Sequence, residues 1–162
     1  MGDFYTEQLV KRQVSSKAAA IKVGLIALTV LTAIGSLFLE ILLVVLVVVI
    51  VLDVILIPRQ NVEYEYLYVN GDLDIDMIMN RQKRKKKFEM NINDMEMMAR
   101  AGAPEVKNIQ TAKTYDFSSG LAENRRYEMI TSNQGQRVRV IFEPNDTIIE
   151  GMRLLAPRKV IV

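Results

Sequence analysis

The residues with the clearest capacity for chemistry form a basic run in the middle of the chain. Six of the seven residues at positions 81–87 are lysine or arginine. Close to a bilayer, such a cluster attracts anionic lipid headgroups by about 1 kcal/mol per basic residue. The candidates for a lipid- or partner-binding site are therefore Arg81, Lys83, Arg84, Lys85, Lys86 and Lys87.

The same run alternates as a β-strand does, which supports a second interpretation. Lys83, Lys85 and Lys87 would point to one face and neutralise an acidic strand beside them. The apolar residues that continue the run would then point inward. On this interpretation Arg81 and Arg84 remain for lipid contact, and the sequence leaves both interpretations open.

Two further charges lie inside an apolar stretch. Across residues 18–57 the charged residues are Lys22, Glu40 and Asp53. Charges within a bilayer are costly and therefore pair or extend to the interface. Lys22 and Asp53 are equally far in sequence from the centre of residues 35–40, so a hairpin turning there places them at similar depth. We expect an intramembrane charge pair; the alternative is that each side chain reaches the interface alone.

Several classes of chemistry are excluded by residue type. The chain has no Cys and no His, and therefore no thiolate nucleophile, no disulfide and no zinc ligand other than carboxylates. Asp72, Asp74 and Asp76 resemble the start of a calcium loop, but Met77 stands where the loop requires Gly. Lys83 occupies the position of its closing Glu. We predict no catalytic residues, no metal site and no cofactor.

The elements that must position these residues begin with the membrane segment. A bilayer core needs about 20 apolar residues in a helix, so residues 18–57 predict two transmembrane helices, at about 18–34 and 41–57. Basic residues flank the hairpin on both sides, which places both termini in the cytoplasm by the positive-inside rule. The cytoplasmic residues 1–17 are predicted to form a short interfacial amphipathic helix or a disordered terminus.

Residues 58–162 predict a cytoplasmic β domain. Asn70 and Gly71 form the preferred pair for a two-residue hairpin turn, which sets Tyr68 opposite Leu73 and Tyr66 opposite Ile75. The opposite face of this hairpin is acidic, and the basic run follows as the next strand. Further strands are expected at about 94–99, 112–117, 126–131 and 137–142, with a final helix over 145–155 capped by Asn145 or Thr147.

This order of strands, followed by one amphipathic helix, resembles a bacterial pleckstrin-homology-like (PH-like) domain. The anchor together with "NVEYEYLYVNGDLDID", "AKTYDFSSG" and "VIFEPND…APRKV" resembles a family of small two-helix membrane proteins from clostridial and related Gram-positive bacteria. The resemblance implies architecture and location, and it supplies no catalytic residues. The fold class it implies is an α+β membrane protein: a transmembrane helical hairpin, then an antiparallel β barrel or sandwich with a C-terminal helix.

We therefore predict a non-enzymatic, membrane-anchored binding or scaffold protein of the bacterial cell membrane. Its cytoplasmic domain would face a protein partner or the lipids of the inner leaflet. The alternative is an accessory subunit of a larger membrane transport or secretion complex, contacted through the helical hairpin. With 17 basic and 15 acidic residues after Pro58, the domain is close to neutral, which argues against nucleic acid as a partner. Self-association stays undecided.

Overall fold

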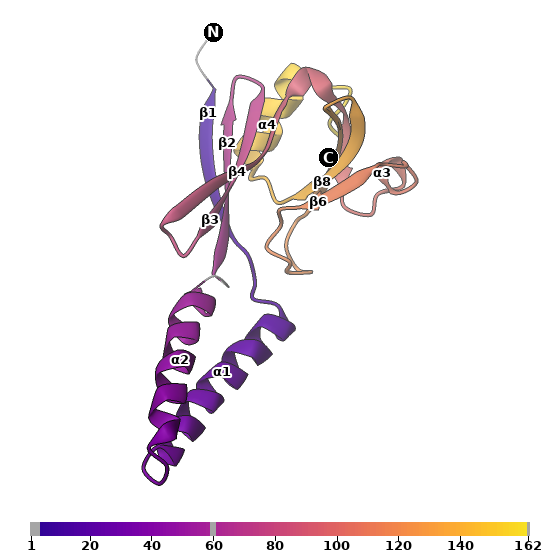
Figure 1. Cartoon of the computed structure of the whole chain (residues 1–162). Helices are drawn as coiled ribbons and strands as arrows, with labels where there is room; N and C mark the ends of the chain where they lie inside the picture. The colour runs from indigo at the N-terminus through magenta and orange to yellow at the C-terminus, as the bar shows by residue number, and fades with distance from the viewer. Residues whose placement is uncertain (1–3, 59–60, 162) are drawn as a thin grey trace. The chain divides into compact units, whose positions relative to one another are not determined.

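A computed structural model describes residues 4–58 and 61–161 of the chain (Figure 1). The described part divides into a helical unit, residues 14–62 and 79–82, and a β domain formed by the other segments. The helices and strands, in chain order, are β1 (Tyr5–Lys11), α1 (Ser16–Gly35), α2 (Ile41–Leu56), β2 (Val62–Val69), β3 (Asp72–Met79), β4 (Lys83–Asn91), η2 (Ile92–Asp94), β5 (Met95–Arg100), α3 (Pro104–Lys107), β6 (Lys113–Asp116), β7 (Tyr127–Asn133), β8 (Gln136–Phe142) and α4 (Asp146–Leu155).

The helical unit contains two apolar helices, α1 and α2, which lie within two residues of the predicted boundaries at each end. The Ser15 side chain caps α1 by accepting a hydrogen bond from the Ala18 N–H at 3.2 Å, which satisfies one of the free amides of the first turn. By length and composition α1 is able to cross a membrane, whereas α2 is a shorter apolar helix of 16 residues.

The apolar side chains of the helical unit mostly point away from it. Thr32 and Val49 are buried where α1 and α2 pack together, while large residues such as Leu31 and Val47 are exposed. An exposed apolar surface that runs along two helices marks a membrane or protein contact. The helical unit is therefore suited to association with a membrane.

The first sheet of the β domain has the strand order β1-β2-β3-β4. The prediction of a helix or a disordered terminus before α1 was wrong over Tyr5–Lys11, which pairs antiparallel with β2 from Tyr5↔Val69 to Lys11↔Glu63; residues 1–3 lie outside the described residues. The physical reason is tertiary. This segment is weakly patterned by itself, but it completes the hydrogen bonds of an otherwise open edge of β2.

The second sheet has the order β5-β7-β8-β6 and is mixed, not purely antiparallel as predicted. β6 runs parallel to β8, with Lys113 opposite Val138. The connection after β5 explains this, because Arg139 on β8 donates hydrogen bonds to the carbonyls of Val106 and Ile109 and holds the connection over the sheet. The chain thereby reaches the far side of β8 before β6 begins. The two sheets form no closed barrel.

Two tight turns set the strand registers. Asn70 and Gly71 both have positive φ, at 49° and 102°, as the predicted two-residue hairpin turn requires. The second hairpin also turns in two residues, Gln134 and Gly135, and is therefore tighter than the gap between the strands expected at about 126–131 and 137–142. The apolar face of the first hairpin is buried as predicted, over Tyr64, Tyr66, Tyr68, Leu73 and Ile75.

The C-terminal helix α4 closes the core of the β domain. Asn145 caps it by accepting a hydrogen bond from the Ile148 N–H at 2.9 Å, one of the two caps that the sequence offers. Ile148, Ile149 and Met152 are buried on its apolar face, whereas Leu155 at the end of the helix is about half exposed. A Cβ on Gly151 would lie 2.7 Å from the Tyr68 ring, so glycine permits the close approach of α4 to the first sheet.

Candidate functional site: the basic strand and the groove beside it

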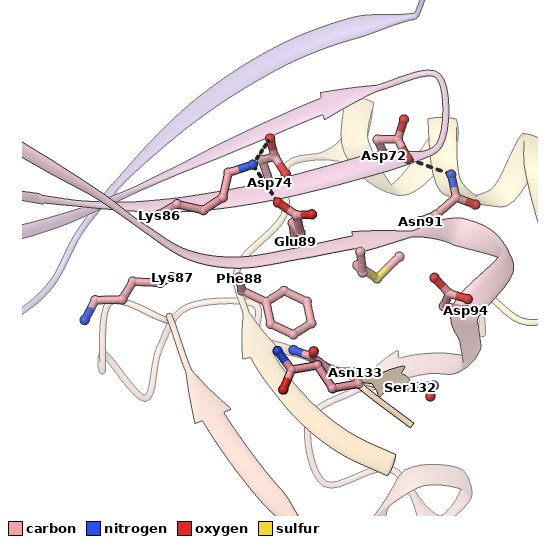
Figure 2. A pocket seen from close by; sticks show the side chains of 12 residues that line it. Asp72, Asp74, Lys86, Lys87, Phe88, Glu89, Asn91, Asp94, Ser132 and Asn133 are labelled. Carbon is pink, nitrogen blue, oxygen red and sulfur yellow. Dashed lines mark hydrogen bonds and ion pairs between the residues drawn. The ribbon is translucent and has the colours of Figure 1, made fainter. Parts of the chain in front are cut away.

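The basic run forms the first half of β4, and two of its members bind the acidic face of the first sheet. Arg84 lies 2.6 Å from Glu65 on β2 and 3.9 Å from Asp76 on β3, so its guanidinium spans three strands. Lys86 pairs with Asp74 at 3.0 Å and with Glu89 at 2.8 Å (Figure 2). The predicted neutralisation of the acidic row therefore occurs, but through Arg84 and Lys86.

This assignment corrects the sequence interpretation, in which Lys83, Lys85 and Lys87 faced the acidic row and Arg84 met lipid. The predicted inward residues Phe88 and Met90 are buried. Strict alternation from Phe88 would also turn Lys86 inward, yet Lys86 shares the outer face with Glu89, three residues further on. One extra residue between them changes the alternation, as a β-bulge does. The apolar pattern before position 88 is too weak to reveal such a change.

Lys83, Lys85 and Lys87 are exposed, and none of them forms an ion pair within residues 4–58 and 61–161. They remain available to a ligand outside the chain. Arg81 lies in the turn between β3 and β4, with φ at 55°. In that turn the Asn80 N–H donates to the carbonyl of Asn61 at 2.9 Å, which ties the turn to the segment that follows α2.

The electrostatics of the acidic face favour a fixed arrangement of charges. Burial raises the pKa of the Glu65 carboxyl, hydrogen bonding with Glu7 raises it further, and the Arg84 charge opposes both. The hydrogen bonds from Lys86 to Glu89 and Asp74 raise the pKa of the Lys86 ammonium. Arg84 and Lys86 therefore serve mainly to hold carboxylates of this sheet and are less suited to bind a ligand.

A groove of about 830 Å³ lies beside the second half of β4 (Figure 2). One wall consists of six consecutive residues of β4, positions 86–91, and the opposite wall is the turn between β7 and β8. Side chains of a strand alternate between its two faces, so a groove over one face would be lined by every second residue. Because six consecutive residues line this groove, it runs along the edge of the strand. Asp72, Asp74, Asp94, Ser132, Asn133 and Gln134 complete the lining.

The predicted pair inside the helical unit has a different partner. The Thr29 hydroxyl lies 2.5 Å from the Asp53 carboxylate, and its oxygen is also 3.1 Å from the Leu25 carbonyl. No ion pair joins Lys22 to Asp53 among the residues that the structure describes. Thr29 lies two helical turns beyond Lys22, about 10 Å along α1. The second Asp53 oxygen is buried without a hydrogen-bond partner in the described chain.

Sequence reasoning missed a buried polar network around Glu143. Its carboxylate accepts hydrogen bonds from the Ser119 N–H and hydroxyl and from the Asn124 amide, at 2.7–3.0 Å. Gln8 of β1 donates to the Glu143 carbonyl at 2.7 Å. The "SSG" and "FEPND" segments therefore position β1 and a loop; no pattern in the sequence indicates which donors meet the carboxylate.

The described residues contain no group of three or more His, Cys, Asp or Glu side chains arranged to hold a metal ion. The arrangement instead offers three exposed cations along a strand and an open groove beside it. Residues 2–162 match the family model described as Bacterial PH-like domain (DUF6106). No curated protein and no solved structure matches the chain.

Proposed function

The chain belongs to the Bacterial PH-like domain family (DUF6106), and from that premise we propose that it is a membrane-anchored, non-enzymatic binding or scaffold protein. The observation that carries this proposal is the combination of a PH-like domain with a helical unit whose apolar side chains point outward. The helical unit anchors the chain, and the β domain offers its surface to a partner protein or to the inner leaflet of the bacterial membrane.

Both helices cross the bilayer in this proposal. α1 has 20 residues and α2 has 16, which correspond to about 30 Å and 24 Å of helix. A hydrocarbon core of about 30 Å suits α1 directly, and local thinning of the bilayer accommodates α2. Basic residues flank the pair on both sides, and none lies in residues 36–40. Both termini are therefore assigned to the cytoplasm.

The basic strand begins close to the inner leaflet. The hydrogen bond between Asn80 and Asn61 holds the β3–β4 turn beside the segment that leaves α2. From Ile57 to Asn61 the chain spans at most about 17 Å even when fully extended. Lys83 follows this turn directly, with Lys85 and Lys87 after it. The headgroup field extends about 8 Å into the cytoplasm at physiological salt, and we propose that the linker holds the β3–β4 turn close enough for Lys83 to enter this field.

The lipid contact is tested with the full chain, because a fragment that starts at residue 61 would lose β1 and open the edge of β2. The chain has no Cys, so Gln82→Cys accepts one environment-sensitive dye. In nanodiscs we expect the dye emission to shift to shorter wavelength when phosphatidylglycerol is added to phosphatidylcholine. The shift should shrink when Lys83, Lys85 and Lys87 are changed to Gln, and also at high salt.

A matched variant controls for net charge. Changing the exposed residues Arg100, Lys107 and Arg153 to Gln removes the same three charges from other parts of the β domain. This variant should retain the full dye shift. Equal loss in both triple variants would show a general charge effect, and no shift in either lipid would remove the inner-leaflet contact from the proposal.

A second candidate function is that of an accessory subunit, contacted through the helical unit. The observation that favours it is the Asp53 oxygen that is buried without a partner, since polar groups in hydrocarbon usually find one in a neighbouring helix. Purification from native membranes in mild detergent should then retain a second membrane protein with the wild type. Asp53→Leu should release that protein while Lys22→Leu retains it; retention by both variants argues for the first candidate.

A further inference from the structure

The edge strands β5 and β4 of the two sheets differ in whether their outer edges are hydrogen-bonded. On the outer edge of β5, the Met98 N–H donates to the Lys159 carbonyl at 2.7 Å, and the Ile161 N–H donates to the Met98 carbonyl at 2.8 Å. The segment after α4 therefore pairs with β5 through a single parallel β-bridge, between Met98 and Val160. β4 is the last strand of its sheet, and among residues 4–58 and 61–161 no strand pairs with its outer edge.

Charge protects the first half of the β4 edge. Lysines on an exposed edge hinder pairing with another copy of the same strand, and positions 83–87 are all basic. The second half, positions 88–91, lacks this protection and lies along the groove. Phe88 and Met90 are buried, so their packing in the core holds this open part of the strand in place.

The two ends of the groove carry opposite charges that have no ion-pair partner within the described residues. Inside the groove, Lys86 is committed to Asp74 and Glu89, and Asp72 accepts a hydrogen bond from Asn91 at 2.6 Å. Lys87 and Asp94 differ, because neither side chain has a hydrogen bond or an ion pair within the described residues, and both are exposed. Figure 2 shows Lys87 at one end of the β4 wall and Asp94 at the other.

We propose that the groove binds an extended segment of a partner protein, which adds to the outer edge of β4 as a fifth strand. Main-chain hydrogen bonds to residues 86–91 supply the affinity, as in other cases of strand addition. Lys87 selects an acidic residue at one end of the segment, and Asp94 selects a basic residue at the other. The length of six residues corresponds to about 20 Å of strand, and a volume of about 830 Å³ lies in the range of ligand-binding pockets.

Synthetic peptides test this proposal on the full chain in nanodiscs. Two capped eight-residue peptides of alternating valine and threonine carry Glu and Lys at opposite ends, in the two possible orders. We expect one order to slow amide hydrogen exchange over residues 86–91. By fluorescence anisotropy that order should bind about fivefold more tightly than the other, since two exposed ion pairs separate them.

Exchange of the two charges provides the decisive variant. Lys87→Glu combined with Asp94→Lys should reverse which peptide binds more tightly. A control that exchanges Glu105 and Lys107, an exposed pair of opposite charges on α3, should leave the preference unchanged. Peptides with proline at alternate positions lack the required N–H groups and should lose both binding and protection.

Several results would overturn the proposal. These are no protection by either peptide, equal binding of the proline peptides, or a preference that the charge exchange leaves unchanged. Protection of β4 that grows with protein concentration in the absence of peptide would assign the edge to a second copy of the chain. The dye response at position 82 is measured independently, so failure here leaves the proposed membrane contact standing.

Discussion

The helical unit and the β domain use the same apolar residue types in opposite directions. Phe38, at the turn between α1 and α2, is 81% exposed, whereas Phe142 on β8 is fully buried. A chain folded in one solvent would bury both kinds of side chain. The proposed membrane anchor accounts for the difference: the two helices lie in hydrocarbon, with their turn and Phe38 at the outer interface, whereas water surrounds the β domain, where apolar side chains must form a core.

The largest expected effect comes from truncating the two phenylalanines. Phe142→Ala should lower the free energy of unfolding of the β domain by about 4 kcal/mol, since it removes a buried ring that packs on Tyr66. Phe38→Ala should change that free energy by less than about 0.5 kcal/mol. Denaturant titration of both full-length variants in micelles, followed by near-ultraviolet circular dichroism, measures the difference. Comparable losses would break the distinction between the two units.

The second largest difference between the two units is expected when a buried carboxylate is neutralised. Glu128 on β7 accepts hydrogen bonds from Arg139 at 2.7 Å and from the Gly102 N–H at 3.0 Å, so Glu128→Gln removes the negative charge that compensates the buried Arg139 guanidinium. The loss should be about 3 kcal/mol, typical of a broken buried pair. Asp53→Asn keeps a hydrogen-bonding side chain beside Thr29 and should cost under about 1 kcal/mol in the same titration. A larger loss for Asp53 would indicate that the helical unit depends on its polar contact.

A positive charge should be tolerated on one unit and rejected by the other. Val47→Arg, on an exposed position of α2, should cost about 3 kcal/mol of membrane insertion. Leu121→Arg, at an exposed position of the β domain, should cost none. The measurement is the fraction of each variant that resists extraction from membranes by alkaline carbonate. Full retention of Val47→Arg would place this face of α2 outside the hydrocarbon.

The smallest effect concerns pH. Burial raises the pKa of Glu65 in the folded state above its ordinary value near 4.5, so the folded domain binds this proton more tightly than the unfolded chain does. The contribution of Glu65 to stability is then largest below pH 4.5 and falls as the pH rises through the raised value. Unfolding titrations from pH 4 to 7 should show this fall, and Glu65→Gln should remove it. An unchanged slope in the variant would assign it to other carboxyls.

Local patterns in the sequence predict much of the fold. The Asn70-Gly71 turn, the alternating tyrosines of β2 and the Asn145 cap each act over a few residues, and each is present in the structure. Features that depend on distant partners were not predictable. β1 becomes a strand because β2 has an open edge, and β6 is parallel because Arg139 holds the preceding connection over its sheet.

The candidate site was predicted in composition but not in geometry. The basic run is plain in the sequence, and its position beside the acidic strands follows from the hairpin. The change of alternation between Lys86 and Glu89 exchanges the roles of neighbouring residues, so Arg84 binds carboxylates while Lys83 and Lys85 stay available. A strand that is basic at every position from 83 to 87 gives no signal of where such a change occurs.

Cysteine labelling tests most directly the claim that the helical unit crosses a membrane with both ends inside. Single Phe38→Cys and Ser132→Cys variants of the Cys-free chain are treated in intact cells, stripped of the outer wall, with a maleimide that does not cross membranes. We predict that Phe38→Cys is labelled in intact cells and Ser132→Cys only after permeabilisation. Labelling of both positions only after permeabilisation would contradict a membrane-spanning helical pair.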